Sequence, residues 1–156
     1  MIAALRRFRA LSRLERGMFV RGVILLPAAA CALRFFPLRD VLRLIGPRSM
    51  CGRIAAEGKQ EEPRGLVEAA QRMTQAASQY GMVRGNCLSK SIVLWRLLRR
   101  AGVPASVRIG GCKEDRQFAA HAWVELDGRV INDPDTTRRF FVPLQRAGNG
   151  ALTGER

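Results

Sequence analysis

A cysteine, a histidine and two neighbouring polar residues are the side chains of this sequence that could carry nucleophilic chemistry together. Cys87 stands on the first turn of an apolar helix predicted within RGNCLSKSIVLWRLLRRAG, and His121 lies in FAAHAWVEL, which alternates as a strand does. A thiolate at a helix N-terminus is stabilised by the unpaired N–H groups and the positive end of the helix dipole. The alternative is that Cys87 packs as a small apolar residue and His121 is an ordinary strand histidine.

The hairpin HAWVELDGRVIND offers two residues that could orient the imidazole, Asn132 and Asp133. Opposed residues of an antiparallel pair point to the same face of a sheet. A two-residue turn at Asp127-Gly128 would place Asn132 on the face of His121 and point the next residue away. A three-residue turn with a bulge would instead make Asp133 the diagonal neighbour of His121. Either set would supply a nucleophile, a base and an orienting group.

An oxyanion hole could be formed by the peptide N–H of Cys87 with a side-chain amide, for which Gln79 and Gln75 are candidates. The sequence has four cysteines, no C-x-x-C pair and one histidine, which excludes the usual zinc-site spacings. It also lacks a G-x-S-x-G motif and a phosphate-binding loop. We therefore expect neither a metal nor a cofactor.

Helices are predicted throughout the first half of the chain. Ser12 and Glu15 match a capping box that opens the apolar segment MFVRGVILLPAAACALRFF, in which Pro27 should kink or end the helix. The uninterrupted apolar run is shorter than a spanning helix needs, which favours a buried or interfacial helix. A second helix should end before Gly46-Pro47, and a third should begin at Pro63.

The second half predicts one core helix followed by an antiparallel meander. The helix should run from Cys87 with Asn86 as its N-cap, and strands follow from Val103 onwards. Because Trp123 and Glu125 alternate with the all-apolar face of the same strand, we expect their face, which carries His121, to be partly open. The class is α+β, divided into a basic helical region (1–80), a core (81–146) and a flexible tail (147–156).

The chain is strongly basic, with a net charge of +14 and an estimated pI of 11.4. The first sixty residues hold 12 basic and 3 acidic residues, a net of +9. The few aromatic residues and the absence of a known module argue against nucleic acid as a partner. An anionic membrane, an acidic protein partner and a solvated arginine-rich face all remain open.

Two stretches together resemble the transglutaminase-like cysteine peptidases of lasso-peptide maturation. The stretch NCLSKSIVLWRLLRRAGVPASVRIGG carries a C-L-x-x-S helix start and a G-V-P-A strand entry, and FAAHAWVELDGRVINDPD carries H-A-W-V-E and D-G-R-V-x-N-D. The resemblance is strong from residue 86 to 144. It implies a transglutaminase-like or papain-like core in which the helix bearing the cysteine packs on an antiparallel sheet.

The resemblance also implies a function, in which the enzyme removes the leader from a precursor peptide. Cys87 would be the nucleophile, His121 the general base and acid, and Asp133 the orienter, which would require the bulged turn; Asn132 remains the alternative orienter. The first 80 residues lack alternating strands, so the chain resembles the split type that depends on a separate small leader-recognition protein. The ATP-dependent macrolactam synthetase of such pathways is a further expected partner.

Two other functions stay open at this level. One is transglutaminase-type acyl transfer to an amine, and the other is a non-catalytic basic module that binds a peptide or an anionic membrane. The N-terminus is too charged for a signal peptide, and thiols without disulfide spacing suit a reducing compartment. We therefore expect a cytoplasmic protein, with membrane association as an alternative. The other cysteines, Cys31, Cys51 and Cys112, are expected to be packed.

Overall fold

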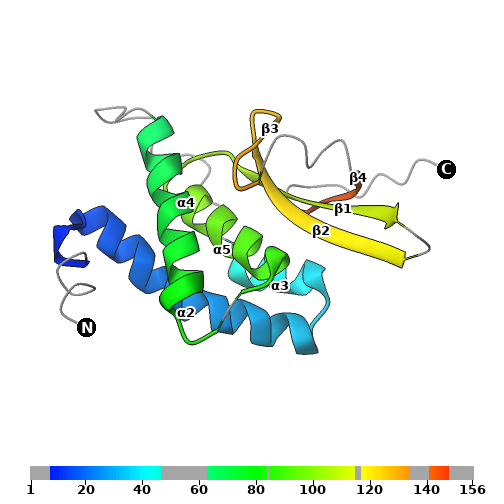
Figure 1. Ribbon diagram of the computed structural model, residues 1–156, viewed down its shortest axis with the longest axis horizontal. Helices are drawn as coiled ribbons and strands as arrows, with labels where there is room; N and C mark the ends of the chain where they lie inside the picture. Colours follow the sequence, from blue (N-terminus) through cyan, green and yellow to red (C-terminus); the bar gives the residue numbers. More distant parts are fainter. Residues whose placement is uncertain (1–7, 47–62, 84, 115–116, 134–140, 148–156) are drawn as a thin grey trace.

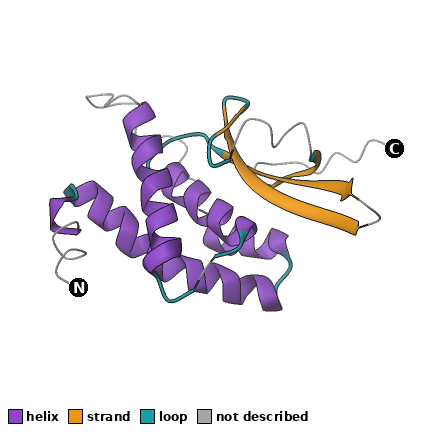
Figure 2. Cartoon of the chain, viewed as in Figure 1, coloured by secondary structure: helices purple, strands orange, loops and turns teal. Residues whose placement is uncertain are grey.

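The computed structural model describes residues 8–46, 63–83, 85–114, 117–133 and 141–147. The helices α2 (Arg13–Phe35), α3 (Leu38–Ile45), α4 (Pro63–Tyr80) and α5 (Cys87–Arg100) precede the strands β1 (Ser106–Glu114), β2 (Gln117–Leu126), β3 (Arg129–Val130) and β4 (Val142–Ala147). The helices form one layer and the sheet another (Figures 1 and 2). The predicted α+β class, with helices before an antiparallel sheet, is confirmed. The tail 147–156 lies outside the described residues after Ala147.

The predicted capping box begins α2. The Ser12 hydroxyl accepts a hydrogen bond from the Glu15 N–H at 3.1 Å, and the Glu15 carboxylate accepts one from the Ser12 N–H at 3.0 Å. The carboxylate also accepts a hydrogen bond from Arg72 of α4 at 3.1 Å. The Ser12 N–H and then Arg72 hold the pKa of Glu15 below its ordinary value. This cap therefore joins the start of α2 to α4 as well as closing the helix end.

Pro27 does not end the helix, because α2 continues to Phe35. Its buried residues Met18, Gly22, Leu26 and Ala29 recur at helical spacing on both sides of the proline. A proline inside a helix removes one hydrogen bond. The burial of one continuous helix face outweighs that loss here. The predicted ends at the other sites are confirmed, since α3 stops at Ile45 and α4 starts at Pro63.

α2 and α4 approach each other closely where two small residues meet. A Cβ added to Gly22 would lie 2.8 Å from the Cβ of Ala77, a separation that real side chains do not adopt. Ala77 and Ala29 are fully buried. A glycine is therefore required at position 22 for this helix packing.

The sheet has the strand order β3-β2-β1-β4, and each neighbouring pair is antiparallel. β1 and β2 form its long central hairpin, with Ser106 opposite Glu125 and Glu114 opposite Gln117. α5 packs against both β2 and β1 and also against α2 and α4. It is thus the element around which the core is built, with eight buried residues of its own.

The predicted partly open face of β2 is open at His121, whose side chain is 24% exposed, and it is closed at Trp123 and Glu125. Trp123 is 0% exposed and Glu125 is 4% exposed. The Glu125 carboxylate accepts hydrogen bonds from Arg108 Nε at 2.9 Å and from Trp123 Nε1 at 3.0 Å. The burial of this carboxylate is compensated by the ion pair and the indole donor, a pairing that a reading of the strand alternation alone could not anticipate.

One hydrophobic cluster joins the helical layer to the sheet. It includes residues of α2, α3, α4 and α5 together with Val107 of β1 and Val124 of β2. Within the described part of the chain, α2 is the one helix long and apolar enough to cross a membrane, judged by its length and composition. Only 22% of its most apolar window is buried inside the protein.

Candidate active site

Cys87 is the first residue of α5, as the sequence predicted. The Asn86 side chain caps the helix by accepting a hydrogen bond from the Ser89 N–H at 2.8 Å, and the Ser89 hydroxyl donates to the Asn86 carbonyl at 3.2 Å. The N–H groups of the first turn have no acceptor within the helix, so their dipoles favour negative charge at this end. The helix start therefore places a half-buried thiol beside N–H groups that have no acceptor within the helix.

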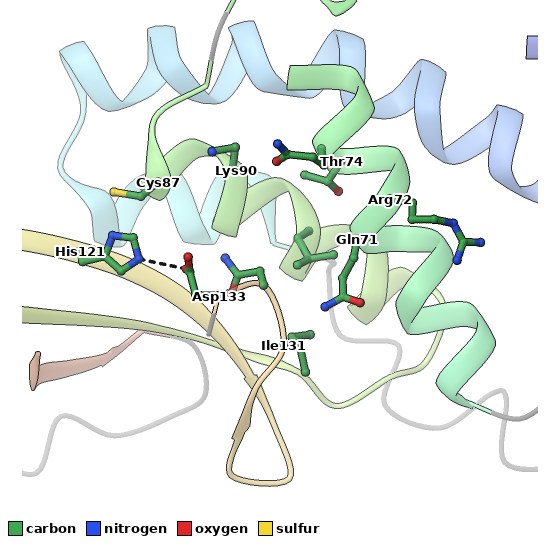
Figure 3. A pocket seen from close by; sticks show the side chains of 11 residues that line it. Gln71, Arg72, Thr74, Cys87, Lys90, His121, Ile131 and Asp133 are labelled. Carbon is green, nitrogen blue, oxygen red and sulfur yellow. Dashed lines mark hydrogen bonds and ion pairs between the residues drawn. The ribbon is translucent and has the colours of Figure 1, made fainter. Parts of the chain in front are cut away.

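The side chains of His121 and Asp133 form a direct hydrogen bond. The Nε2 atom of His121 lies 3.0 Å from Oδ2 of Asp133, and both side chains are about one-quarter exposed, at 24% and 26%. The other ring nitrogen points to the side on which Cys87 is drawn in Figure 3, and both side chains line the same cavity. A carboxylate on Nε2 holds the proton there and leaves Nδ1 free to accept one. This orientation presents the basic nitrogen to the thiol.

The imidazole is also held by aromatic neighbours. Its ring centroid lies 5.2 Å from that of Phe141 and 6.3 Å from that of Trp123, to which it is nearly parallel. Trp123 in turn lies against Gly110 of β1, where an added Cβ would come within 2.7 Å of the indole. Gly110 therefore permits the indole position, and the indole and Phe141 restrict the motion of the histidine ring.

The turn between β2 and β3 differs from the one that Asp133 was expected to require. Leu126 pairs with Arg129, so the turn has two residues, and both have positive φ, 49° at Asp127 and 76° at Gly128. These are the dihedral signs of the favoured two-residue hairpin turn. The prediction that the approach of Asp133 depends on a three-residue or bulged turn is therefore wrong.

Asp133 instead reaches His121 because the returning chain leaves the sheet pattern at Asn132. The Ile131 N–H still donates to the Val124 carbonyl at 3.0 Å. The reciprocal bond is made by a side chain, since the Val124 N–H donates to Asn132 Oδ1 at 2.6 Å. The backbone carbonyl of Ile131 would take this position in a regular ladder. The substitution allows the chain to leave the strand direction just before Asp133.

Asn132 makes a second hydrogen bond, which connects the β2–β3 hairpin to α5, the helix that begins at Cys87. Its Nδ2 donates to the Ser91 hydroxyl at 3.2 Å, and that hydroxyl donates to the Ala122 carbonyl at 2.9 Å. We call Asn132, Ser91 and the two β2 backbone groups the polar clasp. The side chain of Asn132 thus bonds Val124 and Ser91, whereas the hydrogen bond to His121 comes from Asp133. Ser91 was not singled out from the sequence, although it is the serine of the C-L-x-x-S motif.

Cys87, His121, Asp133 and Asn132 line one open cavity of about 370 Å³ between α4, α5 and the hairpin. Its walls also carry Gln75 of α4 and Lys90 of α5. Gln79, the other amide considered for an oxyanion hole, is exposed and is not part of this lining. A further lining residue, Thr74, is buried and its hydroxyl has no hydrogen-bond partner within the described residues. Gln75, which is exposed, is therefore a polar side chain of α4 that a bound chain could meet.

The comparisons with known proteins agree with this architecture. The model of the transglutaminase-like superfamily matches residues 32–146, about three-quarters of the chain, and the chain therefore belongs to that superfamily. The superfamily includes cysteine peptidases and acyltransferases. The match includes α3 and α4 as well as the sheet and the cysteine-bearing helix. No curated protein and no solved structure matches the chain significantly.

Proposed function

We propose that the chain is a cysteine endopeptidase that removes the leader from a lasso-peptide precursor. The observation that carries the catalytic part is the common cavity of Cys87 and the hydrogen-bonded pair of His121 and Asp133. The motifs shared with lasso leader peptidases support the choice of substrate. Membership of the transglutaminase-like superfamily supports thiol chemistry in general.

In this proposal His121 acts first as a base. Its Nδ1 takes the proton of the Cys87 thiol, and Asp133 stabilises the resulting imidazolium through the bond to Nε2. The thiolate attacks the carbonyl carbon of the last leader residue, and its C=O electron pair moves to oxygen. The peptide N–H of Cys87, with Gln75 as the candidate second donor, stabilises that oxyanion.

His121 then acts as an acid. The C–N bond breaks as the imidazolium protonates the leaving amine, so the core peptide departs with a free N-terminus and the leader remains as a thioester on Cys87. Water, deprotonated by the same imidazole, hydrolyses the thioester and restores the thiol. The partners in this scheme are the precursor, a separate leader-recognition protein and the macrolactam synthetase that uses the free amine.

A processing assay tests the proposal. The purified chain is mixed with its lasso precursor and the leader-recognition protein, and the peptides are analysed by mass spectrometry. We expect leader and core whose masses sum to the precursor plus one water, and no cleavage by the Cys87→Ala variant. Cleavage by that variant would show that Cys87 is not the nucleophile. An amine joined to the leader would indicate acyl transfer, and intact precursor with every partner present would indicate a binding module.

A further inference from the structure

The outer side of α2 carries apolar residues where a surface helix normally carries polar ones. Four residues of α2 face the core, namely Met18, Gly22, Leu26 and Ala29. The opposite side is formed by residues spaced four, four, three and four apart, which is one face of a helix. We call these the outer stripe: Val20, Ile24, Ala28, Cys31 and Phe35.

The outer stripe is exposed along its whole length. Ile24 is 62% exposed and Phe35 is 73% exposed. Phe36, directly after α2, and Leu44 of α3, which is 75% exposed, are further exposed apolar residues, and these two line a common hollow. Single exposed apolar residues are ordinary, whereas a continuous exposed patch of this kind marks an interaction site.

Arginines border the outer stripe on both sides. On a helical projection Arg34 lies along one edge, Arg21 lies along the other, and Arg13 lies at the N-terminal end. All three are exposed, and among the described residues none of them forms an ion pair. The one carboxylate of α2, Glu15, is bound by Arg72. The border of the stripe is therefore an uncompensated positive charge.

We propose that the outer stripe docks on an anionic membrane surface, with α2 lying in the interface. Apolar side chains in the centre and arginines at the edges match the acyl region and the anionic headgroups of such a surface. The arginine stems can extend along the apolar region while their guanidinium groups reach the phosphates. The net charge of +9 in the first sixty residues favours the encounter at long range.

The same structure argues for surface docking and against insertion across the membrane. The inner face of α2 is buried on α4 and α5, and Gly22 fits against Ala77. A spanning α2 would have to abandon those contacts. The sheet lies on the far side of α4 and α5 from α2 (Figure 1), so docking through the outer stripe leaves the candidate active site accessible.

Vesicle flotation of the purified full chain tests this surface. The probes are phosphatidylcholine vesicles with and without phosphatidylglycerol. We expect the chain to float only with the anionic vesicles. Ile24→Gln/Phe35→Gln should weaken partition by more than about tenfold, because two large apolar side chains are removed from the buried surface. Its control is Met82→Gln, an exposed apolar residue outside the helix, which should leave partition unchanged.

A second pair of double variants tests the arginines that border the outer stripe. Arg21→Gln/Arg34→Gln should weaken partition by about fivefold for each arginine removed. Arg100→Gln/Arg129→Gln, which removes two exposed arginines from α5 and β3, should have little effect. Equal loss in both variants would mean that the overall charge alone drives binding, and the proposal would be wrong.

Cys31 gives a readout at the surface itself, because it is an exposed member of the outer stripe. Anionic vesicles should slow its alkylation and should leave the rate at Cys112 unchanged. Protein that resists extraction by alkaline carbonate would mean that α2 spans the bilayer. Absence of flotation would also overturn the proposal, and a dimer lost in Ile24→Gln/Phe35→Gln would then assign the stripe to a second copy of the chain.

Discussion

At the scale of single residues, Asn132 and Asp133 are adjacent in the chain but make different contacts. Asp133 binds the imidazole, whereas Asn132 replaces a backbone acceptor for Val124 and holds Ser91. In the proposed mechanism the first contact concerns the reactivity of the site, whereas the second holds the β2–β3 hairpin on α5. Replacing the two residues should therefore affect different measurements.

Asn132→Ala should destabilise the protein by about 1–3 kcal/mol, because the Val124 N–H and the Ser91 hydroxyl would lose a partner at a part-buried position. Chemical denaturation followed by circular dichroism measures the loss. A variant as stable as the natural protein would show that the polar clasp contributes nothing to folding.

Asp133→Asn is the contrasting change, since it keeps the size of the side chain and removes its charge. We expect nearly unchanged stability and a peptide-cleavage rate lower by about 10²-fold or more, because the imidazolium loses its stabilising carboxylate. The cleavage assay and the denaturation curve are measured on the same preparation. Full activity in this variant would show that the negative charge of Asp133 is not needed for cleavage.

At the scale of elements, α2 contains two glycines with opposite surroundings. A Cβ at Gly22 would meet Ala77 at 2.8 Å, whereas a Cβ at Gly17 would meet nothing within 4 Å. Both positions are helical, so alanine should be favoured by about 1 kcal/mol at each on helix propensity alone. The difference between them isolates the packing of α2 on α4.

Gly17→Ala should therefore raise the unfolding temperature, and Gly22→Ala should lower it. The expected cost of overpacking at position 22 is about 1–3 kcal/mol, which exceeds the propensity gain. Thermal unfolding of the two variants under identical conditions gives the comparison. An equal rise in both would mean that α2 can move away from α4 without cost.

The elements also show what sequence patterns can and cannot predict. The Ser12 cap, the start of α5 at Cys87 and the antiparallel hairpin follow from local rules and are confirmed. The continuation of α2 through Pro27 does not follow from them, because it depends on burial of residues from both halves of the helix. The rule that proline ends a helix considers only the lost backbone hydrogen bond and the steric clash, and it does not include the free energy gained from tertiary contacts.

The approach of Asp133 to His121 was beyond local rules for a similar reason. It depends on one side-chain amide taking the place of a backbone carbonyl at Val124. The strand period predicts register only while the ladder is regular. The C-L-x-x-S motif contained Ser91, the partner of that amide, but the motif alone does not say that the serine contacts the hairpin.

At the scale of the whole molecule, the two sides of the helical layer have different character. One side packs on the sheet and forms the cavity of Cys87, and the other exposes the outer stripe and its arginines. Cys31 lies on the second side and is exposed, so the expectation that it is packed is wrong. Because the stretch of α2 from Gly22 to Leu33 is apolar on all sides, its sequence could not indicate which face is buried. Cys51 lies outside the described residues.

The measurement that tests the central claim most directly is alkylation of the native chain by iodoacetamide at about pH 6.5, where an ordinary thiol is about 1% ionised. Peptide mapping gives the rate at each cysteine. Cys31 is the internal control, since it is more exposed than Cys87 and lies within α2 rather than at a helix start.

We predict that Cys87 is labelled about tenfold faster or more than Cys31, despite its lower exposure, and that His121→Ala removes this advantage. Such a result can only come from activation of the thiol, because access favours the control. Labelling of Cys87 no faster than that of Cys31 would contradict the account of an assembled nucleophile and base.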